Sequence, residues 1–188
     1  MITNYVKSYK YLGLLLSSDL SWTHHIESTC TKARKLLGLL YRQFSSNTDP
    51  QVMAKLYLSL VRPHLEYGAQ VWHSYTAKDT HTLEKVQQFG LRICTRHWNS
   101  SYQDLLDIFQ LPSLENRRLF LSLSTFLKII HNLIYFPVNS HPTPLSSSLR
   151  CNHDQQCSIP FARTNHFKYS FLPNSISLWN NLVTFRSC

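Results

Sequence analysis

Apolar residues recur at three- and four-residue steps along most of the first 135 residues of the chain. This spacing is typical of helices that bury one face and expose the other. It predicts four such helices, over about Trp22–Phe44, Ala77–Trp98, Tyr102–Phe109 and Leu114–Tyr135. A further helix is expected to begin at Asp49-Pro50, because an N-cap aspartate followed by proline is a specific helix-start signal.

The leucine-rich stretch Leu56–Trp72 is predicted to be the central helix against which the others pack. Its apolar face is expected to comprise Val52, Met53, Leu56, Tyr57 and Leu60, so Leu60 should be buried. Pro63 removes a backbone donor and crowds the carbonyl four residues earlier, so the helix should kink or restart there.

The two long helices carry apolar seams. The first seam comprises Ile26, Cys30, Ala33, Leu37, Leu40 and Phe44, and the second comprises Leu83, Val86, Phe89, Gly90, Ile93 and His97. Gly90 costs a helix ~1 kcal/mol relative to alanine, and a close helix crossing would explain its presence. Ser21, Ser101 and Ser113 are candidate N-caps for the helices that follow them.

The remaining segments are shorter and less regular. Tyr9–Ser17 is aromatic and apolar, which is typical of a strand, and Gly13 inside it suggests a bulge or a close backbone approach. The proline- and serine-rich segment 136–150 predicts a linker. The expected fold is therefore mainly α. It has a short β segment over 1–21, a helical bundle over 22–135, the linker over 136–150 and a small mixed tail over 151–188.

Charge points to a class of partner. The chain has 19 Lys+Arg against 10 Asp+Glu, a formal net charge of +9, which fits a polyanion such as nucleic acid. Lys32, Lys35 and Arg42 fall within roughly 80° of helix surface opposite the first seam, and Lys85, Arg92 and Arg96 within roughly 40°. Either basic stripe could contact phosphates, or it could be an ordinary solvated face.

Few residue patterns in the chain suggest chemistry. No Asp-Asp pair, P-loop or dinucleotide-binding fingerprint occurs, so no catalysis and no cofactor are expected. Cys151-x-His153-x3-Cys157, with His166 beyond, is the only metal-like cluster, and its spacing departs from that of zinc sites. No apolar run reaches ~18 residues, and no secretory pattern opens the chain. We therefore expect no membrane association and an intracellular location, cytoplasmic or nuclear.

Several motifs, in order, resemble one protein family. They are Lys10-Tyr11-Leu12-Gly13, Arg62-Pro63-His64-Leu65-Glu66-Tyr67 with Trp72 beyond, Leu83-Glu84-Lys85-Val86-Gln87-Gln88-Phe89, the pair Arg117-Arg118, and Ile176-Ser177-Leu178-Trp179-Asn180-Asn181-Leu182. This series resembles the primer grip, thumb and C-terminal tail of LINE-type (non-LTR, jockey-like) retrotransposon reverse transcriptases. The family usually continues with proline after Leu182, where this chain has Val183.

The resemblance implies a β-hairpin, the primer grip, around Tyr11 and Gly13, and a strand within Phe167–Pro173 before the last helix. It adds Lys10, Tyr11, Gly13 and Arg62 to the two stripes as candidate nucleic-acid contacts, whereas Arg117 and Arg118 could equally form surface salt bridges.

The implied function is sequence-independent binding of an RNA/DNA duplex by a non-catalytic C-terminal fragment. Mg²⁺ would be needed only in the intact polymerase. The alternatives are a free-standing helical protein-interaction module and a non-functional remnant. Oligomeric state is not predicted.

Overall fold

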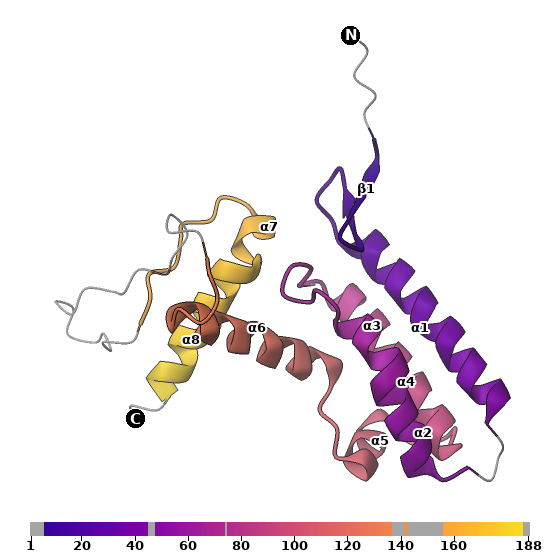
Figure 1. Cartoon of the computed structure of the whole chain (residues 1–188). Coiled ribbons are helices and arrows are strands. Elements are labelled where there is room, and N and C mark those ends of the chain that lie inside the picture. The colour runs from indigo at the N-terminus through magenta and orange to yellow at the C-terminus, as the bar shows by residue number, and fades with distance from the viewer. Residues whose placement is uncertain (1–5, 45–47, 74, 137–141, 143–155, 186–188) are drawn as a thin grey trace. The chain divides into compact units, whose positions relative to one another are not determined.

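The computed structural model describes residues 6–44, 48–73, 75–136, 142 and 156–185. The chain is mainly helical and begins with a two-stranded antiparallel hairpin, as the sequence predicted (Figure 1). The elements in order are β1 (Ser8–Tyr11), β2 (Leu14–Ser17), α1 (Thr23–Gln43), α2 (Pro50–Leu56), the π-helix η1 (Tyr57–Val61), α3 (Arg62–Glu66), α4 (Ala77–Thr95), α5 (Tyr102–Phe109), α6 (Leu114–Ile130), α7 (Asn165–Lys168) and α8 (Phe171–Phe185).

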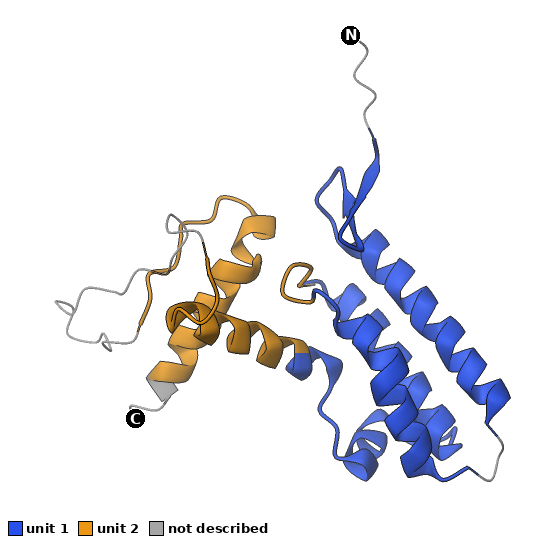
Figure 2. Cartoon of the chain, in the orientation of Figure 1, with its two compact units in different colours: residues 1–68, 74–117 blue, residues 69–73, 118–188 orange. Residues whose placement is uncertain are grey.

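Two compact units divide the chain (Figure 2). Unit 1 comprises Met1–Gly68 and Ser74–Arg117, and unit 2 comprises Ala69–His73 and Arg118–Cys188. The boundary falls inside α6, so most of this helix groups with the C-terminal tail rather than with the bundle predicted over 22–135.

The hairpin turns at Leu12-Gly13, where both residues have positive φ, 46° and 85°. Two positive values in a two-residue loop suit the twist of antiparallel strands, and Tyr11 pairs with Leu14 across the turn. Tyr9–Ser17 is therefore a hairpin rather than one strand with a bulge, because glycine here supplies a turn. The Tyr67 hydroxyl donates to the Leu12 carbonyl at 3.0 Å and holds this turn in unit 1.

Three of the four predicted helix starts are confirmed. Asp49 accepts from the Gln51 amide at 2.9 Å, Ser101 forms a capping box with Asp104, and Ser113 accepts from the Asn116 amide at 3.2 Å. The fourth, Ser21, is wrong: Trp22 is the N-cap residue of α1, and no side chain caps this helix. The Ser21 amide donates to Asp19 at 3.0 Å in the preceding turn.

The core of unit 1 lies between α1, α4 and the α2–η1–α3 segment, which are packed together (Figure 1). The predicted α1 seam is buried from Ile26 to Leu40. On α4 the seam prediction was partly wrong: Phe89 and His97 are exposed, and Leu91 and Cys94 are buried in their place. Gly90 lies at a close crossing as expected, since a Cβ there would lie 2.9 Å from the Tyr57 ring.

The central helix restarts where Pro63 predicted, through a π turn. The Arg62 amide donates to the Tyr57 carbonyl, five residues earlier, so this turn, just before Pro63, holds one residue more than an α turn. Met53, Tyr57, Val61 and Leu65, each four residues apart, are all buried along this segment. In a regular helix each such step would drift ~40°, and the wider turn absorbs that drift.

Leu60 is consequently not a core residue. It is 48% exposed, and Val52 is 44% exposed, whereas Val61 and Leu65 have no exposed surface. The prediction that Leu60 is buried was wrong, because one extra residue in the turn moves the apolar face by about one position.

Unit 2 has its own small core, formed by Phe126 of α6, Ile176 of α8 and Cys157, with Trp179 packed against them. The side-chain amide of Asn180 bonds both the amide and the carbonyl of Cys157, at 3.0 and 2.8 Å, and so fastens this segment to α8. The strand predicted within Phe167–Pro173 is absent. Phe171 opens α8, and Pro173 lies in its first turn, where a missing N–H is tolerated.

The helix predicted to reach Tyr135 ends at Ile130. Asn132 adopts a left-handed conformation with φ of 55°, and the Leu133 amide donates to the Lys128 carbonyl at 2.8 Å. A left-handed residue just after a helix closes its last carbonyls and stops it.

A pair of variants tests the π-turn register. Leu65→Ala should destabilise the protein by about 2–5 kcal/mol, because it leaves a cavity at a position with no exposed surface. Leu60→Ala should cost less than about 1 kcal/mol. Urea unfolding measures both, and equal losses would contradict the register described here.

Two glycines offer a matched test of the crossing. Gly90→Ala should destabilise by about 1–3 kcal/mol, since its methyl group would meet the Tyr57 ring at 2.9–3.0 Å. Gly38→Ala in α1 should stabilise by about 0.5–1 kcal/mol, because no heavy atom lies within 4 Å of its added methyl. The melting temperature should fall for Gly90→Ala and rise for Gly38→Ala. A higher melting temperature for Gly90→Ala would show that the Tyr57 ring can shift to make room for the methyl group, and would contradict a rigid crossing.

Candidate nucleic-acid interface

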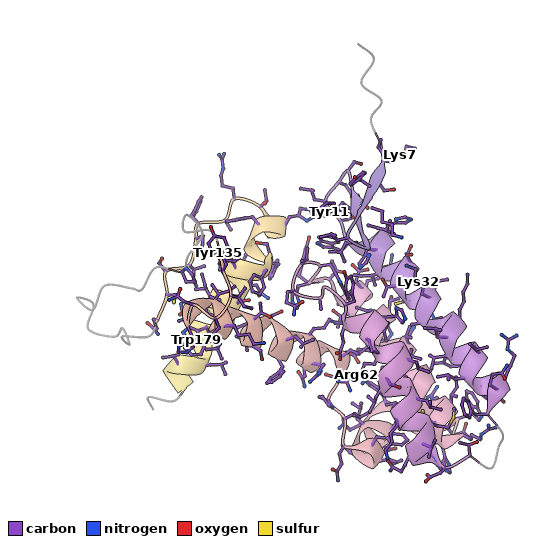
Figure 3. All side chains as sticks on the ribbon, viewed as in Figure 1. Lys7, Tyr11, Lys32, Arg62, Tyr135 and Trp179 are labelled. Carbon is purple, nitrogen blue, oxygen red and sulfur yellow. The ribbon has the colours of Figure 1, made fainter. Side chains whose placement is uncertain are left out.

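The first basic stripe lies on the exposed face of α1. Lys32, Lys35 and Arg42 are all exposed, opposite the buried seam (Figure 3 labels Lys32). None of the three forms an ion pair with a residue that the structure describes, and Arg42 donates only to the Gly38 carbonyl of its own helix, at 3.2 Å. These charges are therefore available to a partner.

The second stripe is less available. Lys85 is exposed, but Arg92 donates to the Ser100 carbonyl at 3.2 Å and so holds the loop after α4. Arg96 ends α4 in a left-handed conformation and donates to the Phe44 carbonyl at 3.2 Å, which ties the C-terminal ends of α1 and α4 together. Both arginine side chains therefore bend towards backbone carbonyls of the protein itself. A helical projection gives only the side of the helix from which a side chain leaves, so it does not show this bending.

Arg62 is a structural residue. It is 8% exposed, and its Nε lies 2.6 Å from Oε1 of Glu66, the same oxygen that Arg117 Nε approaches at 3.3 Å. Its assignment as a nucleic-acid contact is corrected, because breaking a buried ion pair would leave Glu66 without its nearest cation. For Arg117 the salt-bridge interpretation is confirmed. Arg118 is buried in unit 2, with its guanidinium 5.9 Å from the centre of the Trp72 ring.

On the hairpin, Lys10 and Tyr11 are exposed, and Gly13 lies in the turn beside the ring of Tyr67 (Figure 3 labels Tyr11). The hairpin is also joined to α1, because the Leu15 amide donates to Nδ1 of His25 at 3.3 Å. Burial lowers the pKa of His25, and the charges of Lys32 and His24 lower it further. A neutral imidazole keeps Nδ1 able to accept this hydrogen bond.

Most acidic side chains have a hydrogen-bond or ion-pair partner within the protein. Glu84 accepts from the amides of Leu114 and Glu115 and from the Tyr102 hydroxyl, and so caps α6 from a neighbouring helix. Asp79 accepts from Thr76 and Thr23 at 2.8 and 3.2 Å. Seven of the ten acids accept a hydrogen bond or form an ion pair in this way: Asp19, Asp49, Glu66, Asp79, Glu84, Asp104 and Asp107.

Two segments therefore present positive charge without nearby acids along the chain. Residues 28–48 contain Lys32, Arg34, Lys35 and Arg42, and residues 85–103 contain Lys85, Arg92 and Arg96, with no Asp or Glu in either. These segments cover the C-terminal halves of α1 and α4, which pack against each other.

Sequence reasoning missed an aromatic cluster in the same region. Tyr41, Phe89 and Trp98 are 44%, 40% and 47% exposed, and the Trp98 ring lies beside each of the other two rings. Phe89 had been assigned to the buried seam of α4. Its position one turn after Lys85 and one turn before Arg92 is the signal that would have placed it on the exposed face.

Metal binding finds no support within the described part of the chain, where no group of three or more potential ligands lies together. Cys151 and His153 of the cluster noted in the sequence fall outside the described residues. Cys157 is buried, burial raises the pKa of its thiol, and its backbone is bound by Asn180. A thiol in this setting is a core residue.

Comparisons with protein-family models, with curated proteins and with solved structures find no match to this chain. Among the described helices, none is both long enough and apolar enough to cross a membrane.

Proposed function

We propose that this chain binds an RNA/DNA duplex through its backbone, as the thumb-like C-terminal part of a LINE-type retrotransposon reverse transcriptase. The observation that carries the proposal is the exposed stripe of Lys32, Lys35 and Arg42 on α1, which has no ion-pair partner among the described residues. A thumb must hold any sequence, and phosphate contacts position a duplex without reading its bases.

Two further features support this proposal. Three acids, Glu66, Asp79 and Glu84, are at least partly buried and bonded within the fold, and the surplus of basic residues favours a polyanionic partner. The motif order along the chain resembles that family from the hairpin to α8. We take the contact surface to consist of Lys32, Lys35 and Arg42, with Lys10 and Tyr11 on the hairpin and Lys85 on α4 as further contacts.

We further propose that the chain does not catalyse by itself. Nucleotide addition uses two metal ions held by carboxylates. The sequence contains no pair of adjacent aspartates, and Asp49, Glu66 and Glu84 of unit 1 serve as helix caps or as an ion-pair partner. No cofactor is required for the binding role.

One observation favours the alternative of a protein-interaction module. In unit 2, the large apolar side chains of Phe120, Leu133 and Tyr135 are 60%, 74% and 87% exposed and could contact a protein partner. The basic stripe lies in unit 1, and only duplex binding through that stripe should depend steeply on salt. The salt test below therefore discriminates duplex binding from protein interaction.

Salt dependence tests duplex binding. Each phosphate neutralised releases condensed counterions, so three contacts should weaken binding by roughly fortyfold between 50 and 200 mM salt. Replacing Lys32, Lys35 and Arg42 together by glutamine should remove most of this dependence, measured as the anisotropy of a labelled blunt RNA/DNA hybrid. Affinity should vary little with the sequence of the hybrid.

A matched control keeps the charge change the same. Lys128, Arg163 and Lys168 are exposed residues of unit 2, and their triple glutamine variant removes the same three charges. Its salt slope should stay close to that of the parent protein, and both variants should retain the helical circular dichroism spectrum. Identical slopes in the two triple variants would reject the stripe as a contact surface.

Primer extension tests the second part of the proposal. The purified chain, given Mg²⁺, primer, template and nucleotides, should extend no primer, because it lacks the carboxylate pair that holds the two metal ions. Extension above that of a heat-inactivated sample, resolved on a sequencing gel, would contradict the non-catalytic assignment.

A further inference from the structure

The aromatic cluster of Tyr41, Phe89 and Trp98 lies where α1 and α4 end. The two helices run parallel, because Thr23 bonds Asp79 near their N-terminal ends and Arg96 bonds Phe44 near their C-terminal ends. Trp98 follows α4 and stands between the other two rings. Its ring centroid lies 6.3 Å from that of Tyr41, edge to face, and 6.2 Å from that of Phe89.

Each of the three residues leaves much of its surface to solvent. Exposed fractions of 40–47% on three aromatic residues grouped around Trp98 call for an explanation, whereas an isolated exposed aromatic residue would need none. The cluster lies entirely within unit 1.

Positive charge surrounds these rings. The guanidinium carbon of Arg96 lies 5.4 Å from the centre of the Tyr41 ring. Lys85 precedes Phe89 by about one turn of α4, and Arg34 precedes Tyr41 by about two turns of α1, so each shares a side of its helix with the ring. Both are exposed, and neither forms an ion pair with a described residue.

Exposed rings flanked by cations, in segments without acids, match the chemistry of single-stranded nucleic acid. Bases stack on aromatic rings because every base has a π face, and cations hold the phosphates between them. A base-paired duplex hides its base faces and could use only the cations. Charge complementarity therefore favours a polyanion with free bases over a protein segment as the occupant.

We propose that Trp98, with Tyr41 and Phe89, forms a stacking site for unpaired bases of a single strand, with Lys85 and Arg34 contacting the adjoining phosphates. This inference rests on the proposed function and adds to it that unit 1 holds a single-stranded extension as well as a duplex. Trp98 is the central residue, because it contacts both other rings.

The test uses three labelled probes in anisotropy titrations: a short oligothymidylate, an abasic strand of the same length, and a blunt RNA/DNA hybrid. The full chain should bind the oligothymidylate about five- to hundredfold more tightly than the abasic strand, the range expected for one stacked base. Trp98→Leu should abolish this difference, because leucine preserves apolar packing but has no π face. Trp98→Phe should keep a substantial part of it.

Hybrid binding separates this inference from the proposed function. Trp98→Leu should bind the blunt hybrid as the parent chain does, and an unchanged thermal melt shows that the variant is folded. Equal affinity for the thymidylate and abasic strands, or equal thymidylate binding by the parent chain and Trp98→Leu, overturns the stacking site and leaves the rings as a protein-contact surface or a brace for the loop after α4. A base-dependent affinity lost in Trp98→Leu supports the site even if the hybrid is not bound, in which case only the duplex proposal fails.

Discussion

At the crossing of α4 and η1, the ring of Tyr57 lies against Gly90, where an added Cβ would come within 2.9 Å of it. The Tyr57 hydroxyl donates to Gln87, whose amide donates in turn to Tyr102 and to the Pro112 carbonyl. The Tyr102 hydroxyl donates to the Glu84 carboxylate, which also accepts from the Glu115 amide and so caps α6. Buried polar groups are costly unless all are paired, so this chain of hydrogen bonds specifies one arrangement of α4, α5 and the start of α6. A side chain at position 90 would displace its first member.

Local signals were readable from the sequence because they act over a few residues. Asp49, Ser101 and Ser113 start helices through bonds to amides two or three positions away. The π turn was not readable, because its geometry depends on Pro63 together with the burial of Tyr57 and Val61 on one face. Periodicity alone assumes 3.6 residues per turn, so it assigned Leu60 to the core in place of Val61.

The candidate interface was half predictable for a related reason. A helical projection gives the direction in which a side chain leaves the helix. Lys32 and Lys35 leave α1 on its solvent side and are exposed, so the projection placed their charges correctly. Arg92 and Arg96 leave α4 on its exposed side but reach back to carbonyls at the helix ends. Arg62 pairs with Glu66 one turn later, a spacing visible in the sequence but not distinguishable there from two solvated charges.

Folding itself sharpens the charge pattern that the composition only suggests. In the fold Asp79 and Glu84 accept hydrogen bonds at helix starts, whereas Lys32 and Lys35 of α1 stay in solvent. A polyanion that bound these lysines in their folded arrangement would bind the folded state more tightly than the unfolded chain. Any ligand with that preference stabilises the fold by mass action, by about 2.7 kcal/mol at a hundred times its dissociation constant. If the proposed surface of Lys32, Lys35 and Arg42 binds a polyanion, that binding would also add stability to the helical bundle of unit 1.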